Sequence, residues 1–223
     1  MAKTALVLGA SGLVGNELLH LLLKDSHFDK VKIFVRKPIA ISHKKLEQHI
    51  INFDAITDYK EFIKGDVFFC CIGTTINTAG SKEAFIKVDY TYPTEFAKIA
   101  KTNNVKHFLF ISSIGADENS SNFYLMVKGD TENTLTELDF EKLDIVRPSL
   151  LTGKRNEIRF GEIVGKVVMK ALSFLFIGKL RKYKPIEATT VAKAMIKLSA
   201  QKTNAPKKNA IVLSDQLQAL GGQ

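Results

Sequence analysis

The chain has 223 residues, of which 45% are hydrophobic, and carries 32 Lys and Arg against 23 Asp and Glu, a formal net charge of +9. This length suits one α/β domain with a sizeable core, and the composition excludes a disordered chain and a solenoid of repeats. The lysines are spread over the polar sides of amphipathic segments. We therefore expect a solvated basic surface, part of it a pocket for a phosphorylated cofactor, and no nucleic-acid partner.

Two features bear on the cellular compartment. The only cysteines, Cys70 and Cys71, are adjacent inside an apolar run, which favours buried thiols in a reducing compartment over a disulfide framework. The first apolar run belongs to a predicted strand and leaves no room for a signal peptide. The sequence therefore predicts a cytoplasmic protein.

A glycine-rich turn follows the first predicted strand, residues 5–8, and leads into a helix that includes 17–23. Glycines tolerate positive φ, let a backbone approach a pyrophosphate, and allow a helix to pack closely on a strand. The spacing Gly-x-x-Gly-x-x-Gly differs from the usual Gly-x-Gly-x-x-Gly, and a turn without a ligand is the alternative. We expect the helix N-terminus to bind a phosphate through this turn. Its predicted cofactor-binding residues are Gly9, Ala10, Ser11, Gly12, Leu13, Val14 and Gly15.

Two cations, Arg36 and Lys37, follow the second predicted strand, 31–35. An acid at this distance from the glycines would bind the adenosine ribose of NAD. A guanidinium instead can clamp a 2′-phosphate. The pattern predicts that NADP(H) is preferred over NAD(H), the alternative being a solvated arginine at a strand end.

The next two predicted strands also end in candidate cofactor residues. The strand over 47–53 ends at Phe53 and Asp54, which would flank the adenine. The run 66–72 is continuously apolar, as expected of a buried parallel strand. Its end contributes Cys71, Ile72, Gly73, Thr74 and Thr75. A long helix is then predicted over 81–103, kinked or re-entered at Pro93, with its apolar face formed by Phe85, Val88, Tyr92, Phe96, Ile99 and Ala100.

The catalytic site is predicted between the end of a fifth strand, 107–113, which carries Ser112 and Ser113, and a helix that begins near Phe123. Tyr124 and Lys128 stand four apart on that helix and project from one face. A nearby ammonium lowers the pKa of a phenol, which can then exchange a proton with a carbonyl oxygen. A serine hydroxyl would hold the same oxygen. Alone, Tyr-x-x-x-Lys more often marks two surface residues.

The C-terminal part begins after a sixth strand, 143–147, which Pro148 closes. A polar loop over 151–160 is a natural lid above a substrate. The apolar stretch 161–178 contains two lysines and is excluded as a transmembrane span, which leaves core packing, a homodimer face or a membrane surface. A helix over 189–200 and a strand over 210–213 follow, and the spacing of the five histidines suggests no metal site.

With these residues placed, the sequence resembles the atypical short-chain dehydrogenases related to the human Tat-interacting oxidoreductase and its small bacterial homologues. The resemblance spans nearly the whole chain and rests on the motifs Gly9 to Gly15, Val88-Asp89-Tyr90, His107-Phe108, Ser112-Ser113, Gly115-Ala116-Asp117, Tyr124 with Val127-Lys128-Gly129, Arg147-Pro148, Arg155, Glu157, Arg159 and Gly161-Glu162.

The resemblance implies a doubly wound parallel sheet of the NAD(P)-binding Rossmann type, NADP(H) across the strand ends, and a site of Ser113 or Ser112, Tyr124 and Lys128. We expect one domain over 1–223, in which 149–223 supplies a helical lid and substrate side. Ser112, Tyr124, Lys128 and Pro148 are also expected to contact the cofactor. The predicted function is hydride transfer between NADPH and a small carbonyl or alcohol. The alternatives are an NADP(H)-sensing protein that regulates a partner, and an epimerase of nucleotide sugars.

Overall fold

The computed structural model describes residues 3–153, 178–201 and 209–222. Seven parallel strands form one sheet in the order β3-β2-β1-β4-β5-β6-β9. The strands are β1 (Lys3–Leu8), β2 (Phe28–Val35), β3 (Leu46–Ile50), β4 (Val67–Cys70), β5 (His107–Ile111), β6 (Lys142–Arg147) and β9 (Asn209–Leu213). The prediction of a doubly wound sheet is confirmed. Because the chain order reverses beside β1, ligands are expected at the carboxyl ends of the strands near this point.

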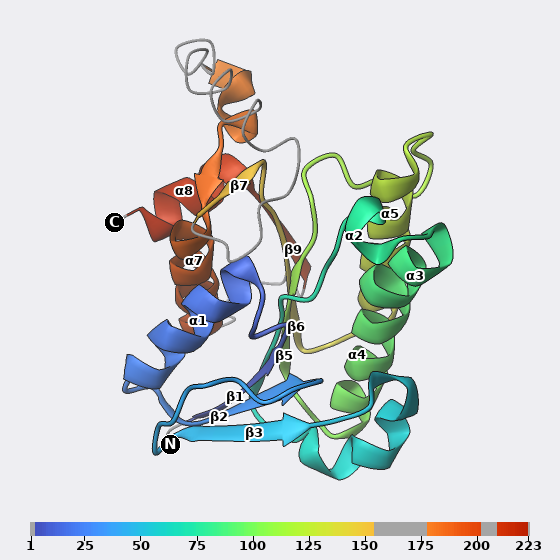
Figure 1. Cartoon of the computed structure of the whole chain (residues 1–223). Coiled ribbons are helices and arrows are strands. Elements are labelled where there is room, and N and C mark those ends of the chain that lie inside the picture. The colour runs from blue at the N-terminus through green and yellow to red at the C-terminus, as the bar shows by residue number, and fades with distance from the viewer. Residues whose placement is uncertain (1–2, 154–177, 202–208, 223) are drawn as a thin grey trace.

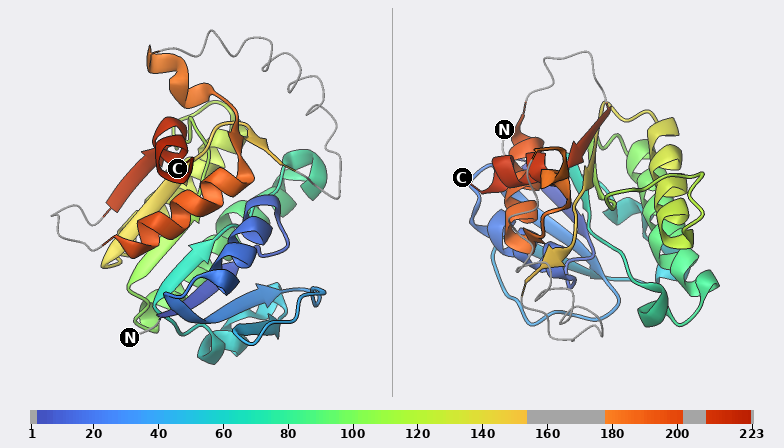
Figure 2. Two further views of the ribbon diagram at one scale, coloured as in Figure 1. Left: turned by 90° about the vertical axis from the view of Figure 1, so that its left-hand side faces the viewer. Right: turned by 90° about the horizontal axis from the view of Figure 1, so that it is seen from above.

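Helices cover both faces of the sheet, as Figure 1 and the two turned views of Figure 2 show. One face carries α1 (Leu13–Lys24), α7 (Ala188–Ala200) and α8 (Ser214–Gly221). The other carries α2 (Ile76–Ala79), α3 (Lys82–Ile86), α4 (Tyr92–Thr102) and α5 (Phe123–Glu137), with the 3₁₀ segment η1 (Phe53–Phe62) and the π turn η2 (Lys87–Thr91). A 3₁₀ segment η4 (Gly178–Tyr183) and a two-stranded parallel pair, β7 (Leu151–Thr152) with β8 (Ile186–Glu187), complete the described chain.

The central strands are buried because both of their faces lie under helices. All four residues of β4 and all five of β5 are buried, which explains their continuous apolar runs. Two apolar clusters result, one beneath α1, α7 and α8 and the other beneath α4 and α5. The second is rich in phenylalanine, and the rings of Phe68 and Phe108 stack with their centroids 4.9 Å apart. This packing fixes the strand ends that carry the candidate site.

Several predicted boundaries differ from the structure. The third strand ends at Ile50, and Phe53 instead begins η1, because the Asn52 side chain accepts a hydrogen bond from Asp54 N and caps that segment. The predicted strands 66–72 and 107–113 are shorter at their carboxyl ends. The helices α2 and α8 were not predicted.

The long helix predicted over 81–103 is divided by the π turn η2, and its buried face differs accordingly. Val88 and Tyr92 are only half-buried, whereas Asp89 is fully buried. A π turn adds a residue to the helical repeat, so the sides of the helix before and after it fall out of phase. The predicted lid begins with β7 and Gly153, and its residues 154–160, together with the apolar stretch over 161–177, lie outside the described residues.

Candidate cofactor and active site

The glycine turn joins β1 to α1 with almost no space between its backbone and that of the β4 end. Gly9 has φ +85°, and a Cβ there would lie 2.6 Å from Cys71 C and Ile72 N. A Cβ on Gly15 would lie 2.1 Å from Gly9 O. Gly12 is the N-cap of α1 and has no side chain to cap it, and among the described residues no other side chain accepts a hydrogen bond from the first turn of the helix. The turn is therefore a close-packed cradle whose helical N–H groups suit a phosphate.

The cations after β2 are exposed at the same edge of the sheet. Within the part of the chain that the structure describes, neither Arg36 nor Lys37 forms an ion pair or hydrogen bond. Both are therefore available to an anion, as the sequence predicts for a 2′-phosphate.

The predicted adenine residues have different surroundings. Phe53 is buried and packs edge-on against Tyr92, with ring centroids 5.2 Å apart. Asp54 accepts a hydrogen bond from the Tyr92 hydroxyl at 2.7 Å and pairs with Lys87 at 2.8 Å. These two contacts hold the pKa of the exposed Asp54 carboxyl below its usual value. The Phe53 ring therefore belongs to the core, and only Asp54 presents a polar side chain at the surface.

The end of β4 runs beside the glycine turn. Cys71 N donates to Leu8 O at 2.8 Å, and Thr74 N donates to the Asp89 carboxylate at 2.8 Å. Thr75 caps α2 by accepting a hydrogen bond from Thr78 N. Burial raises the pKa of the Cys70 thiol to about 12 and the pKa of Cys71 well above its usual value, so neither thiol is a nucleophile at neutral pH.

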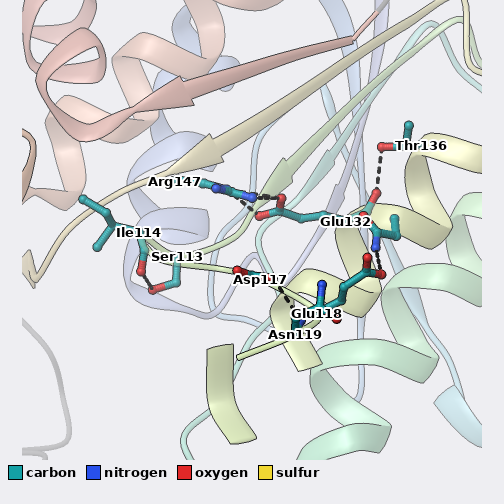
Figure 3. Close-up of polar contacts among 9 residues, drawn as sticks. Ser113, Ile114, Asp117, Glu118, Asn119, Glu132, Thr136 and Arg147 are labelled. Atoms are coloured by element: carbon teal, nitrogen blue, oxygen red, sulfur yellow. Dashed lines mark hydrogen bonds and ion pairs between the residues drawn. The ribbon is translucent and has the colours of Figure 1, made fainter. Parts of the chain in front are cut away.

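The two serines after β5 differ in exposure and in partners. Ser112 is 5% exposed, and its hydroxyl has no hydrogen-bond partner among the described residues. Ser113 is half-buried and its hydroxyl donates to Ile114 O at 3.4 Å, a contact seen in Figure 3. An unpartnered buried hydroxyl costs about 1–3 kcal/mol, so a site that supplies a partner from a ligand would explain Ser112.

The predicted tyrosine and lysine both belong to α5. The Asn122 side chain caps this helix by accepting from Tyr124 N at 3.0 Å and Leu125 N at 3.3 Å, which places Tyr124 in the first turn. Tyr124 is half-buried, and its ring lies 5.6 Å from that of Phe85. The ammonium of Lys128 lies in the protein interior, 5.1 Å from the centre of the Phe110 ring.

The charge of Lys128 is maintained by a buried acid. Its Nζ lies 2.8 Å from Asp89 Oδ1 and donates a long hydrogen bond of 3.5 Å to Ile111 O. Burial by itself lowers the pKa of Lys128, but Asp89 and, to a smaller extent, Tyr124 outweigh it and leave this pKa above its usual value. Lys128 is therefore a cation at neutral pH, close to the phenol that it is expected to tune.

The loop between Ser113 and α5 is held against that helix. Asp117 N donates to Leu125 O, and Asp117 Oδ1 accepts from Asn119 N at 2.9 Å (Figure 3). A Cβ on Gly129 would lie 2.2 Å from Glu118 N, so only glycine permits this contact. The serine and the Tyr-Lys helix are thus joined by a short, tightly packed connection.

A second ion pair, between the half-buried Arg147 and the buried Glu132, fixes α5 to β6 and is not predicted from the sequence. Arg147 binds the Glu132 carboxylate through Nε at 2.9 Å and Nη2 at 2.5 Å, and Glu132 lies one turn beyond Lys128 (Figure 3). Asp89 was likewise missed as a partner of Lys128. The available signal was an acid four residues after Phe85, on the side of the helix that Phe85 buries.

The start of the C-terminal part lies above the glycine turn. A Cβ on Gly153, directly after β7, would lie 2.9 Å from Leu13 Cδ1. Pro148 is buried at the end of β6, and its carbonyl accepts from Ile114 N at 3.1 Å. The predicted residues at the ends of β1, β4, β5 and β6 therefore come together at one edge of the sheet.

The described ranges 3–153, 178–201 and 209–222 contain no cluster of three His, Cys, Asp or Glu side chains suited to a metal ion. None of their helices has the length and apolar character needed to cross a membrane.

A parallel sheet in this order, a glycine cradle at its switch point and a Tyr-Lys helix beside it define an NAD(P)-binding Rossmann protein of the oxidoreductase class. Comparison with known families agrees, since the model described as NAD(P)H-binding matches residues 9–172. The chain belongs to this NAD(P)H-binding family and is an atypical short-chain dehydrogenase-like protein.

Two curated relatives illustrate the resemblance. Protein HTATIP2 of Rattus norvegicus is 38% identical over 164 residues, which cover 72% of this chain and 67% of the relative. The mitochondrial Protein FMP52 of Kluyveromyces lactis is 35% identical over 217 residues and 96% of each chain. The resemblance predicted from the motifs is confirmed.

Solved structures share the fold at low identity. The enzyme WbmH of Bordetella bronchiseptica, in complex with NAD⁺, has a TM-score of 0.71 and 15% identity over 94% of this chain and 75% of its own. A UDP-glucose 4-epimerase of Thermotoga maritima, with UDP-glucose, has a TM-score of 0.69 and 14% identity over 98% and 82%. At this identity the likeness establishes the Rossmann fold alone.

The prediction of a cytoplasmic protein is wrong by these comparisons. Several relatives that match most of the chain are described as mitochondrial, among them those of Debaryomyces hansenii, Kluyveromyces lactis and Coccidioides immitis. The prediction relied largely on the two adjacent cysteines in an apolar run. Reduced thiols do not distinguish the cytoplasm from other compartments in which thiols stay reduced.

Proposed function

We propose that this protein is an NADP(H)-dependent oxidoreductase that transfers hydride between the nicotinamide and the carbonyl carbon of a small aldehyde or ketone. The observation that carries the proposal is the buried Lys128 cation on the same helix as Tyr124, beside a strand end that carries Ser112 and Ser113. These are the residue types that a proton-coupled hydride transfer needs.

The proposed roles follow from the chemistry of each side chain. Bound NADPH supplies the hydride. Tyr124 donates a proton to the carbonyl oxygen as the carbon is reduced and takes it back in the oxidation of an alcohol. The Lys128 charge lowers the free energy of the phenolate, which eases both directions. Ser113, or Ser112 with its unpartnered hydroxyl, donates a hydrogen bond to the same oxygen.

The residues around the glycine turn suit a dinucleotide. The close approach of Gly9 to the end of β4 leaves no room for side chains where a pyrophosphate would lie, and the first turn of α1 has free N–H donors. Arg36 and Lys37 are unpaired within the described ranges and favour a 2′-phosphate, which supports NADP(H) over NAD(H).

The test is NADPH oxidation, followed by absorbance, across a panel of aldehydes, ketones and semialdehydes, with NADH in parallel. Tyr124→Phe removes one oxygen and should lower kcat by about 10²- to 10⁴-fold with little change in NADPH binding. Tyr90→Phe is the matched control, since its hydroxyl accepts from Thr134 at 3.3 Å and has no part in the proposed mechanism. Full turnover by Tyr124→Phe would refute the proposed mechanism.

Regulation of a protein partner by the bound cofactor is the second candidate. It follows from the resemblance to the family of the Tat-interacting oxidoreductase, but a sensor alone has no need of a charged lysine on the same helix as a tyrosine. NADPH binding without turnover on any compound, together with a partner whose affinity depends on NADPH, would favour it. Binding of nucleoside diphosphate sugars would instead favour the epimerase alternative.

A further inference from the structure

Asp89 occupies an unusual place in the fold. It lies in the π turn η2, which interrupts the helical segment between α3 and α4, and it is fully buried. Isolated π turns are uncommon, and they often occur at functional sites because they reorient one side chain. The carbonyls of Tyr90 and Thr91 are satisfied by the Thr94 hydroxyl, at 2.9 and 3.1 Å. The Thr94 side chain therefore stabilises the π turn by hydrogen-bonding to two of its backbone carbonyls.

Each polar group of Asp89 binds a different part of the candidate site. Oδ1 lies 2.8 Å from Lys128 Nζ, and Oδ2 accepts from Thr74 N at 2.8 Å. Its carbonyl accepts from the Thr131 hydroxyl at 2.9 Å, which ties the turn to α5. A Cβ on Gly73 would lie 3.3 Å from Oδ1 and 3.6 Å from Lys128 Nζ, so the predicted cofactor loop passes directly over the pair.

The groups that face the Lys128 ammonium explain why it needs this acid. Asp89 faces it from η2, Tyr124 from its own helix and Cys70 from β4, while β5 contributes the Phe110 ring and the Ile111 carbonyl. Of these, Asp89 carries the only full negative charge at neutral pH. A buried lysine without a counter-ion tends to lose its proton, and a neutral amine would not stabilise a phenolate.

We infer that Asp89 is a positioning residue that keeps Lys128 charged and aimed at the ends of β4 and β5, and that connects this lysine to the cofactor loop through Thr74 N. The inference rests on the proposed function, in which Lys128 acts with Tyr124. Lys128 has three N–H donors, and the described residues offer it Asp89 and a distant carbonyl. One donor is left for the tyrosine or for a cofactor hydroxyl.

The first test does not depend on turnover. The ¹³Cε shift of Lys128, assigned with Lys128→Arg, is titrated by NMR in the full chain without cofactor. In the native protein we expect a cationic shift up to at least pH 10.5, whereas in Asp89→Asn the amine should titrate at least one pH unit lower. Asp144→Asn is the matched control, because Asp144 is an equally buried acid paired with Lys142 and His107 at the opposite end of the sheet. It should leave the Lys128 titration unchanged.

The second test is the pH profile of kcat. We expect the alkaline fall in kcat to occur at a pH at least one unit lower in Asp89→Asn than in the native enzyme. At the optimum, kcat of this variant should be at least tenfold lower, and KM should change less than threefold. Asp89→Glu keeps the negative charge but displaces it. In this variant Lys128 should titrate at the native pH, while kcat should stay low. If Asp89→Asn does not fold, native-like kcat in Asp89→Glu would overturn the positioning role.

Different results would overturn the role of Asp89 and the proposed function. Loss of stability in Asp89→Asn with an unchanged titration and pH profile would reduce Asp89 to a structural residue and overturn the inference alone. Full turnover by Tyr124→Phe would overturn the proposed function, while the NMR titration would still decide whether Asp89 controls the charge of Lys128.

Discussion

Strand β5 has a cluster of buried polar side chains, including an ion pair, near each of its ends. The two clusters differ in how many of their polar groups have hydrogen-bond partners within the protein. At the amino end, Asp144 accepts from His107 at 2.8 Å and pairs with Lys142 at 3.3 Å. The same lysine donates to Leu198 O at 2.8 Å. At the carboxyl end, Lys128 pairs with Asp89 and the neighbouring Ser112 hydroxyl has no partner in the described residues.

This difference separates a structural cluster from a site prepared for a ligand. Buried polar groups are nearly always paired. The Ser112 hydroxyl has no partner among the described residues, and it directly follows Ile111, whose carbonyl accepts from Lys128, so a ligand is expected to complete this end. The position agrees, because parallel α/β sheets bind ligands beyond the carboxyl ends of their strands. The amino-end cluster holds β5, β6 and α7 together, and among the described residues none of its fully buried side-chain polar atoms lacks a hydrogen-bond partner.

The largest effect should come from breaking the carboxyl-end pair. Lys128→Met leaves Asp89 as a buried, unpaired charge and should cost about 3–5 kcal/mol in the free energy of unfolding, together with nearly all turnover. Lys142→Met at the other end should cost about 1–3 kcal/mol and leave kcat unchanged, because Asp144 keeps His107. Urea unfolding and NADPH oxidation measure the two quantities.

A double variant distinguishes a loss of turnover caused by lost stability from one caused by the loss of Lys128 itself. Replacing both charges, as in Asp89→Leu with Lys128→Met, removes the unpaired carboxylate and should recover most of the lost unfolding free energy without recovering turnover. If turnover returned with stability, Lys128 would have only a structural role. Loss of kcat in Lys142→Met would mean that the amino-end cluster also contributes to turnover.

A smaller effect is expected from replacing Arg36, an exposed cation at the carboxyl edge of the sheet that has no partner among the described residues. Arg36→Ala should weaken NADPH binding about tenfold or more and leave NADH binding nearly unchanged, since a charge-assisted hydrogen bond contributes about 1.5–3 kcal/mol. Fluorescence titration with both cofactors measures this ratio. Lys106→Ala is the control, because its exposed ammonium pairs with Glu141 beyond the amino end of β5. Equal losses for both cofactors would contradict a 2′-phosphate contact.

The sequence was sufficient to predict what depends on local pattern. Continuous apolar runs predicted the buried strands, and the glycine spacing predicted a turn whose Gly9 and Gly15 have no room for a Cβ. The positions of the candidate residues, directly after predicted strands, also predicted that they meet, because the carboxyl ends of parallel strands lie at one edge of the sheet.

What could not be predicted depends on contacts between distant segments. Asp89 stands four residues after Phe85 on the buried side of the helical segment, but no local pattern pairs it with Lys128, 39 positions later in the sequence. The pair between Arg147 and Glu132 likewise joins a strand to a helix. The unpartnered Ser112 hydroxyl is a property of three-dimensional packing that no residue pattern records.

The smallest effect concerns the pH dependence of the amino-end cluster. Burial lowers the pKa of His107 and Asp144 raises it, but burial together with Lys142 and Lys3 prevails, so this pKa is below 6.5 in the folded protein. The folded state therefore disfavours the protonated imidazole. The stability that depends on a neutral His107 is fully present above about pH 6.5, the value expected in the unfolded chain, and is lost as the pH falls from there towards the folded pKa.

The measurement is the free energy of unfolding in urea between pH 7.5 and 5, for the native protein and His107→Gln. Below pH 6.5 the native protein should lose up to about 1.4 kcal/mol per pH unit more than the variant. Burial lowers the pKa of His49 as well, but this histidine is present in both proteins and cancels in the difference. At pH 7.5 the variant should have native kcat. Parallel stability curves would show that the amino-end cluster does not disfavour protonation of His107, and a lowered kcat would show that it communicates with the site at the other end of β5.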